Sequence, residues 1–208
     1  MSDRPRIAVL DYGIGNLRSA QKALEHVGAD AVLTADPTKV AAAAGVVLPG
    51  VGAFGRCMQA LEHTGLDSVA RDAVGSGRPF LGVCIGMQLL YERSEEDPGC
   101  AGLGILSGTV RRLASGVKHP QMQWNTLDVV RPSWLLDGIP DPAWVYFVHS
   151  FAPDDTDNVV ATCDYGGPVA AAVESANVAA TQFHPEKSGA VGLGILGAFV
   201  VRCGLVRA

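Results

Sequence analysis

The sequence lacks the marks of several large classes of protein. Its 208 residues include 16 lysines and arginines against 21 aspartates and glutamates, a formal net charge of −5, so there is no basic surplus of the kind that binds nucleic acid. No apolar run reaches the roughly 18 residues of a membrane-spanning helix, and the start has no basic segment followed by an apolar core and a cleavage site. We therefore expect a cytoplasmic protein with no nucleic-acid partner and no membrane contact.

Cysteine is scarce and irregularly spaced. The cysteines are odd in number and form no C-x-x-C pair, which argues against a disulfide framework and against a zinc site. They are Cys57, Cys84, Cys100, Cys163 and Cys203. By default each is expected to be a buried, inert thiol, and we expect neither a metal nor a cofactor.

The first half of the chain has the alternating strand and helix pattern of an α/β protein. Apolar residues make up 48% of the sequence, enough for the core of one domain over residues 1–208. Short β-branched runs alternate with amphipathic stretches, which is typical of a parallel sheet covered on both faces. The predicted strands are Arg6–Leu10, Ala31–Thr34, Gly45–Leu48 and Pro79–Val83, and the predicted helices are Leu17–Val27 and Ile85–Glu92.

The pattern changes after about Leu103. Strand-like segments then follow one another with few helical intervals, which predicts a mixed or antiparallel part of the sheet. They are Thr109–Leu113, Leu127–Val130, Ala143–Val148, Val159–Cys163 and Val169–Glu174, before a last helix over Val191–Cys203. We therefore expect a three-layer α/β/α sandwich with a mostly parallel central sheet, in which ligands bind at the carboxyl ends of the strands.

A glycine-containing turn follows the first predicted strand and reads GIGNLR from Gly13 to Arg18. It departs from the dinucleotide fingerprint G-x-G-x-x-G because arginine stands in the third glycine position, and it has no Gly-Lys-Ser/Thr of a phosphate-binding loop. A tight turn between strand and helix is the simpler interpretation. A cofactor loop stays open as an alternative, since Asp36 lies near the distance at which an acid would hold a ribose.

A nucleophile elbow is predicted in the stretch FLGVCIGMQLL. An apolar strand meets a helical run with no room for a loop, and Gly82 and Gly86 stand two residues before and after Cys84. In such an elbow the glycines relieve crowding around a strained turn that exposes one side chain. A thiol at a helix N-terminus is favoured as the thiolate. The alternative is a small buried cysteine between two packing glycines.

A base and an orienting acid are predicted in ATQFHPEKSG. Ala179–Phe183 has the character of a strand, and His184 precedes a proline, which favours extended geometry. Because side chains two apart in extended chain point the same way, Glu186 is expected beside His184. The imidazole would take the thiol proton and the carboxylate would fix its tautomer. Alone, the H-P-E sequence is a weak signal, because a histidine near a strand end is more often an ordinary surface or core residue, and the signal becomes much stronger when paired with the elbow.

An oxyanion site is predicted in the stretch PGVGAF, after the strand Gly45–Leu48. Gly50 and Gly52 allow backbone N–H groups around Val51 to point into a cleft, although a plain Pro-Gly turn is the alternative. Gln88 lies one helical turn after Cys84 and is expected either to contact a polar substrate or to be an ordinary solvated glutamine.

Taken together, the stretches GVCIGMQ, PGVGAF and HPE resemble the triad-type (class I) glutamine amidotransferases. Within that family DYGIGNLRSAQKAL, LPGVGAFG, YFVHSF and TQFHPEKSG are similar to the glutaminase subunits of imidazole glycerol phosphate synthases. The resemblance covers almost the whole chain. It implies that Cys84 forms a γ-glutamyl thioester, that His184 is the general base and acid, and that Glu186 orients it.

The resemblance also implies how substrate and partner bind. Contacts to glutamine are expected from Gly52, Gln88, Glu96 and the backbone around Ser150 and Phe151. Interface positions are expected at Asn16, Trp124, Tyr146 and Lys187. The implied partner is a cyclase subunit with a (β/α)₈ barrel, which would form a heterodimer with this chain, take up the ammonia, and produce imidazole glycerol phosphate and an aminoimidazole carboxamide ribotide (AICAR) in histidine biosynthesis.

On this resemblance the Gly13–Asn16 turn binds no nucleotide and helps to form the border with the synthase subunit. One departure from the family pattern is Gln123, where glycine is usual, and it raises a question about the backbone near the ammonia exit. Two rival functions remain: a glutaminase of another synthase or a stand-alone cysteine amidohydrolase, and a non-catalytic binding module. The PGVG and DYGIGN stretches favour the histidine-pathway function, and the presence of all three triad residue types argues against the binding module.

Overall fold

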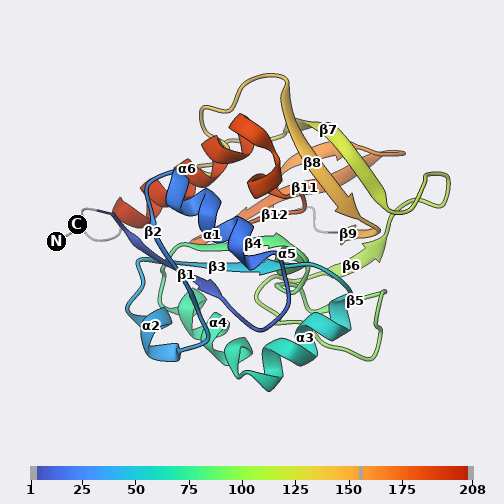
Figure 1. The fold of residues 1–208 in the computed structure, drawn as a ribbon. Helices are drawn as coiled ribbons and strands as arrows, with labels where there is room; N and C mark the ends of the chain where they lie inside the picture. The colour runs from blue at the N-terminus through green and yellow to red at the C-terminus, as the bar shows by residue number, and fades with distance from the viewer. Residues whose placement is uncertain (1–3, 155–156, 206–208) are drawn as a thin grey trace.

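The computed structural model describes residues 4–154 and 157–205, and its largest feature is a central nine-stranded sheet (Figure 1). One half of this sheet is parallel. Its strands are β2 (Asp30–Thr34), β1 (Arg6–Leu10), β3 (Gly45–Gly50), β4 (Phe80–Cys84) and β12 (Val178–Thr181), in that spatial order. β3, β4 and β12 are buried along their whole length, as expected for strands that are covered on both faces.

The other half continues from β12 through antiparallel strands. They are β11 (Pro168–Ser175), β10 (Val159–Asp164), β7 (Gln121–Val129) and β8 (Ala143–His149). In β8 buried side chains alternate with exposed or half-buried ones, so one face of this end packs on the core and the other is open. A small second sheet contains β5 (Arg93–Ser94), β6 (Thr109–Arg112) and β9 (Phe151–Pro153).

Helices cover both faces of the parallel half (Figure 1). On one side lie α1 (Leu17–His26) and α6 (Gly189–Leu205), and on the other α2 (Pro37–Ala41), α3 (Phe54–His63) and α4 (Leu66–Gly75). Two short turns of helix follow central strands: α5 (Ile85–Gln88) after β4, and the 3₁₀ helix η1 (Pro185–Lys187) after β12. In the part of the chain that the structure describes, no helix is long and apolar enough to cross a membrane.

The predicted α/β sandwich is confirmed, but its sheet is more evenly mixed than expected. Four neighbouring pairs of described strands are parallel and four are antiparallel. The change falls between β12 and β11, consistent with the predicted antiparallel part of the chain. The helices α2, α3 and α4 were not among the expected elements.

The helix predicted over Ile85–Glu92 ends at Gln88, so that prediction was too long. The carbonyl of Leu89 accepts from the N–H of Leu103, and the carbonyl of Leu90 accepts from Ile105 and Leu106. A continuing helix would need these carbonyls for its own next turn. Hydrogen bonds with the segment from Leu103 to Leu106 therefore replace helical hydrogen bonds, and no local sequence pattern predicts this replacement.

Glycines join β3, β4 and α5 by close backbone contacts. A Cβ on Gly86 would overlap the backbone oxygen of Leu48, and a Cβ on Gly82 would lie 2.8 Å from the backbone oxygen of Gly86. Neither oxygen belongs to a flexible side chain that can move aside. Glycine at both positions is therefore required for the short helix to pack against the two strands.

We expect Gly86→Ala to lower the free energy of unfolding by about 3 kcal/mol, the upper part of the usual range for overpacking, because the added methyl meets backbone. Gly194→Ala is the matched control, since a Cβ there meets nothing within 4 Å and alanine is the better helix former. Chemical denaturation of the two variants and the parent measures both effects. Equal stability of Gly86→Ala and the parent would contradict the packing described.

Candidate active site

Cys84 occupies the predicted elbow: it is the last residue of β4, and α5 begins at the next residue, Ile85. Its backbone has φ 55° and ψ −109°, a conformation that non-glycine residues rarely adopt. Strain of this kind persists only where the surroundings enforce it, and it gathers at functional sites. The side chain is 3% exposed and lines a pocket of about 230 Å³. The N-terminus of α5 contributes less to the thiolate than that of a longer helix would, because the helix has only one turn.

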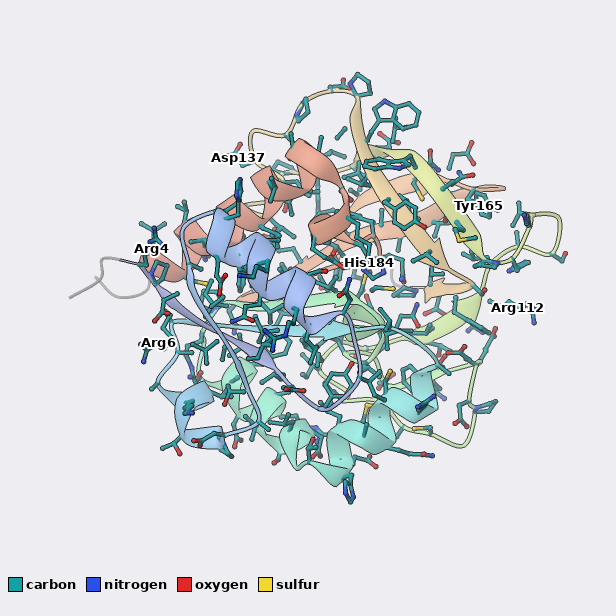
Figure 2. The ribbon with its side chains drawn as sticks, in the orientation of Figure 1. Arg4, Arg6, Arg112, Asp137, Tyr165 and His184 are labelled. Carbon is teal, nitrogen blue, oxygen red and sulfur yellow. The ribbon has the colours of Figure 1, made fainter. Side chains whose placement is uncertain are left out.

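His184 reaches the same pocket although it is 100 positions from Cys84 in the sequence. β12 pairs in parallel with β4, with Thr181 opposite Val83, so the carboxyl ends of the two strands lie together. His184 follows β12 in extended geometry, with φ −99° and ψ 97°. Figure 2 shows it toward the middle of the molecule, and only 1% of it is exposed.

Glu186 lies against the histidine as predicted, but by a different route. The Nδ1 of His184 is 2.8 Å from Oε1 of Glu186. The residues after His184 form the 3₁₀ helix η1 rather than extended chain, and its tight turn brings the carboxylate back to the ring. With Nδ1 bonded to this carboxylate, Nε2 is the ring nitrogen that remains for Cys84.

The two histidines at the pocket have opposite electrostatic surroundings. Burial disfavours the charged form of His184, but the nearby Cys84 sulfur and the hydrogen-bonded carboxylate of Glu186 outweigh burial and raise the pKa of His184 to about 9. Burial lowers the pKa of His149 to about 4, against the effect of its hydrogen bond to the Phe151 carbonyl. The imidazolium form is therefore favoured at His184, and the neutral ring at His149.

The stretch from Gly50 to Gly52 borders the nucleophile. Gly50 ends β3 directly opposite Cys84, Val51 and Gly52 line the pocket, and Gly52 has φ 107°. The carbonyls on either side of the Gly50–Val51 peptide are held: Tyr12 Oη donates to Pro49 at 2.7 Å, and Cys57 Sγ donates to Val51 at 3.4 Å. Burial raises the pKa of Cys57 to about 11, which keeps the thiol as a donor.

The glycine turn after β1 lies against this stretch. Gly13 and Gly15 have φ values of 80° and 130°, so the backbone itself requires glycine there. A Cβ on Gly15 would lie 4.0 Å from the Cα of Gly50, which places the turn beside the pocket wall. Asp36, the ribose ligand of the alternative cofactor interpretation, caps α2 by accepting from the Thr38 N–H at 2.9 Å.

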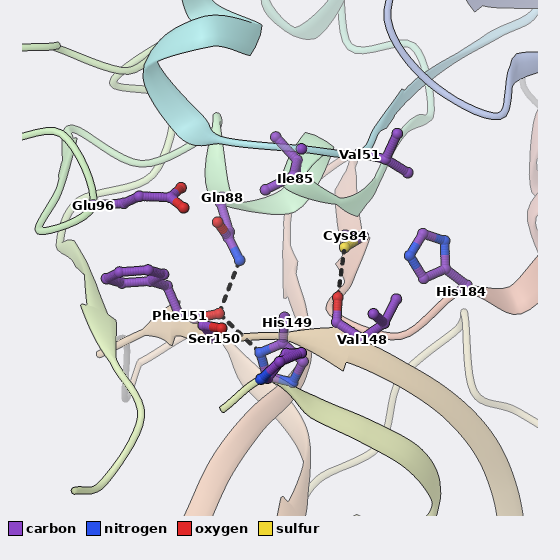
Figure 3. Close-up of a pocket in the computed structure, with 12 residues that line it drawn as sticks. Val51, Cys84, Ile85, Gln88, Glu96, Val148, His149, Ser150, Phe151 and His184 are labelled. Carbon is purple, nitrogen blue, oxygen red and sulfur yellow. Dashed lines mark hydrogen bonds between the residues drawn. The ribbon is translucent and has the colours of Figure 1, made fainter. Parts of the chain in front are cut away.

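The remaining predicted substrate residues line the pocket together. Figure 3 shows Cys84 and His184 at one end, Glu96 and Phe151 at the other, and Gln88 between them. Gln88 is 1% exposed, so it is not the solvated glutamine of the alternative interpretation. Its Nε2 donates to the Phe151 carbonyl at 2.8 Å.

Glu96 and Ser150 complete the far end of the pocket. Oε2 of Glu96 accepts from the N–H of Phe54, the first residue of α3, at 2.7 Å. The carboxylate is thus oriented by a helix start and leaves its other oxygen for a ligand. Ser150 stands between His149 and Phe151, where β8 passes into β9, so its backbone borders the pocket.

Three of the predicted interface residues gather next to the triad. The rings of Trp124 on β7 and Tyr146 on β8 lie 6.1 Å apart, and these two residues are directly opposite in the strand pair. Tyr146 is tied to the segment after β12, because its carbonyl accepts from the His184 N–H and its own N–H donates to Ser188 Oγ, each at 3.0 Å. Lys187 lies in that segment and is exposed.

The fourth interface residue, Asn16, is exposed at the start of α1, directly after the glycine turn. Gln123, which replaces the usual glycine, lies in β7 opposite Phe147 and is exposed. Its φ is not positive, so this part of β7 keeps ordinary strand geometry with glutamine in place.

One residue that lines the pocket, His149, and several that lie around it were missed in the sequence. His149, Gln182, Tyr12 and Cys57 surround the predicted residues but were not singled out, because their partners come from distant strands. The stretches TQFHPEKSG and YFVHSF contain two of them. Among the cysteines, Cys57, Cys163 and Cys203 are buried thiols as expected, whereas Cys100 is only partly buried.

Comparison with known proteins agrees with this geometry. The family model described as "Glutamine amidotransferase class-I" matches residues 8–202. A protein of Methanothermobacter thermautotrophicus named "Imidazole glycerol phosphate synthase subunit HisH" is 50% identical over 195 residues, 93% of this chain and 97% of the relative. A protein of the same name from Bacillus cereus (strain G9842) is 46% identical over 191 residues, 91% of each chain.

Solved structures agree on the fold. A crystal structure described as a glutamine amidotransferase has a TM-score of 0.76 at 21% identity, with 95% of this chain and 98% of that one covered. A chain in the structure of PurLQS from Thermotoga maritima has a TM-score of 0.73 at 23% identity, with 98% and 99% covered. At these identities the likeness concerns the fold alone.

The opposite environments of the two histidines predict separate titrations. We expect the ring of His184 to stay protonated until the pH approaches about 9, and that of His149 to stay neutral down to about pH 4. Because the folded pKa of His184 is raised above the ordinary histidine value of 6.5, its contribution to stability is complete below pH 6.5 and is lost as the pH rises through about 9.

NMR titration of the histidine ring carbons measures these values. In Cys84→Ala the midpoint of His184 should fall, because the contact with Cys84 is the larger of the two that raise its pKa. Midpoints near 6.5 for both rings would contradict the described environments.

Proposed function

The chain belongs to the class-I glutamine amidotransferase family, and from this we propose that it is the glutaminase subunit of an imidazole glycerol phosphate synthase. The observation that carries the proposal is identity of 46% and 50% over more than nine-tenths of the chain to proteins of that name. The enzyme hydrolyses glutamine to glutamate and ammonia, and a cyclase subunit uses the ammonia in histidine biosynthesis.

Cys84 is the nucleophile of the proposed reaction. The proton of the Cys84 thiol resides on Nε2 of His184, which is then an imidazolium, and the thiolate sulfur attacks the side-chain amide carbon of glutamine. The protonated imidazole then gives this proton to the leaving nitrogen, so that ammonia departs and a γ-glutamyl thioester remains. Water, deprotonated by His184, attacks the thioester and releases glutamate. Glu186 holds the ring through Nδ1 during both steps, which the 2.8 Å contact supports.

The negative oxygen formed in each step needs nearby donors. The proposed donors are backbone N–H groups of the Gly50–Gly52 stretch, which lies opposite Cys84 in the sheet. At the other end of the pocket, the free oxygen of Glu96 suits the α-ammonium of glutamine, and the backbone around Ser150 and Phe151 suits its carboxylate. Gln88 lies between them and orients the chain of the substrate. The pocket of about 230 Å³ suits a ligand of this small size.

The relatives are named as subunits, which indicates that this chain works within a complex. The proposed partner is a cyclase with a (β/α)₈ barrel that forms a heterodimer with this chain. Its docking surface would include Asn16, Trp124, Tyr146 and Lys187. In support, β7 and β8 expose Met122, Trp124 and Trp144 by 60%, 48% and 50%, an unusual display of large apolar groups beside a catalytic pocket.

The first test concerns the nucleophile. We expect Cys84→Ala to abolish glutamate production while leaving fold and partner binding intact, because removing the thiol removes the chemistry and little packing. An enzyme-coupled glutamate assay measures the loss of activity. Circular dichroism checks the fold, and co-purification of the cyclase checks partner binding. Cys163→Ala, at a buried free cysteine away from the pocket, is the control and should retain activity. Glutamate production by Cys84→Ala at the rate of the parent would refute the assignment.

The second test concerns the partner. We expect the isolated chain to be a poor glutaminase that gains about 10² to 10³ in rate on the cyclase subunit with its nucleotide substrate bound, about 3 to 4 kcal/mol, the usual value of one oxyanion donor. Glutamate release is measured for the chain alone, with the subunit, and with subunit plus substrate. Exchange of Trp124 for alanine should weaken the stimulation, whereas Arg6→Ala, at the exposed start of β1, should not. Full activity of the chain alone, unchanged by either addition, would favour the stand-alone amidohydrolase instead.

A further inference from the structure

A buried glutamine, Gln182, contacts the proposed nucleophile and has no role in the proposed hydrolysis. Gln182 follows β12 and is 0% exposed. Its backbone N–H donates to the Ala171 carbonyl of β11 at 2.8 Å, so its position in the sheet is fixed. Its side chain contacts two residues of the active site, Gln88 and Cys84.

The orientation of the Gln182 amide follows from a chain of hydrogen bonds. The Phe151 carbonyl can only accept, so Gln88 must present Nε2 to it, at 2.8 Å. The same Nε2 has a second hydrogen, which reaches Oε1 of Gln182 at 3.1 Å. With its oxygen engaged there, Gln182 turns Nε2 toward the sulfur of Cys84, at 3.8 Å. A backbone carbonyl at the substrate end of the pocket thus determines that the nucleophile receives an N–H group.

An N–H donor favours the thiolate over the thiol, since it stabilises the charged form. The contact that favours the thiol form is longer and weaker: the thiol of Cys84 donates to the Val148 carbonyl at 4.0 Å. Of the titratable groups around the sulfur, His184 faces it from the end of β12 and is favoured as a cation. Tyr12 and Cys57 lie on the other side, and burial raises the pKa of both, so they stay neutral. Gln182 therefore provides a neutral donor in addition to the imidazolium.

We propose that Gln182 is a further catalytic residue of this enzyme, an amide donor that stabilises the Cys84 thiolate, and that Gln88 holds it in the donating orientation. The inference rests on the proposed role of Cys84 as the nucleophile. It adds a function for Gln88 that is separate from binding glutamine: Gln88 fixes the direction of the Gln182 amide before any substrate arrives.

Alkylation of Cys84 by iodoacetamide tests this without substrate or partner, because the reagent reacts with the thiolate. The rate is measured as a function of pH for the full chain, and mass spectrometry identifies the modified cysteine. We expect Gln182→Met to shift the midpoint of the pH profile upward by about one unit, the effect of losing one hydrogen bond to a charged group. Gln88→Met should shift it in the same direction by less, because Gln182 keeps its amide but loses its orientation.

Thr181→Val is the matched control. Thr181 is the neighbouring buried residue, and its hydroxyl donates to the Phe183 carbonyl at 3.0 Å rather than to the active site. This variant should lose some stability and keep the pH profile of the parent. If Gln182→Met does not fold, as judged by circular dichroism, the shift in Gln88→Met decides the question.

Two negative outcomes can be told apart. If Cys84 of the parent reacts in preference to the other cysteines but the glutamine variants have the parent's midpoint, Gln182 has no part in stabilising the thiolate and the inference is overturned. If Cys84 of the parent is not modified preferentially, the assignment of the nucleophile fails and this inference fails with it.

Discussion

The parallel pairing of β4 with β3 on one side and β12 on the other is the constraint on which the active site depends. It aligns the carboxyl ends of three strands that are far apart in the sequence. Gly50 is opposite Cys84, and Thr181 is opposite Val83, shortly after which the chain reaches His184. A slip of one residue in either pairing would turn side chains to the opposite face and separate Cys84 from His184. The wider sheet and the covering helices keep this register in place.

The strained backbone of Cys84 is supported by the same contacts. With φ at 55°, the residue relies on its neighbours to prevent relaxation. Gly86 packs on the backbone of β3 and Gly82 packs on Gly86, so strand, elbow and short helix have little freedom to separate. The rigid scaffold thus fixes the thiol, while the residues proposed to bind substrate come from α5 and from the connection where β8 passes into β9.

The sequence allows part of this site to be predicted: residues whose neighbours within a few positions define their role are identifiable, and residues whose partners are distant in the sequence are not. Cys84 is identifiable because its elbow depends on glycines two residues away. His184 and Glu186 are adjacent enough to be predicted as a pair, but only chemical reasoning joins them to Cys84. Gln182 escapes prediction, since its role depends on hydrogen bonds to residues 94 and 98 positions away. The early end of α5 escapes it for the same reason, because residues of a later segment take its carbonyls.

The two tethered carbonyls beside the nucleophile have a geometric consequence. Tyr12 holds the carbonyl of Pro49 and Cys57 holds that of Val51, so the peptide between Gly50 and Val51 lies between two tethered carbonyls. Rotation of one such peptide plane changes ψ of Gly50 and φ of Val51 in opposite senses, while the chain on either side keeps its position. Such a turn at the end of β3 would move the N–H of Val51 while the two tethered carbonyls and the core behind them keep their positions. Reorientation of this kind is confined to one bond pair, so it proceeds without any part of the sheet coming apart.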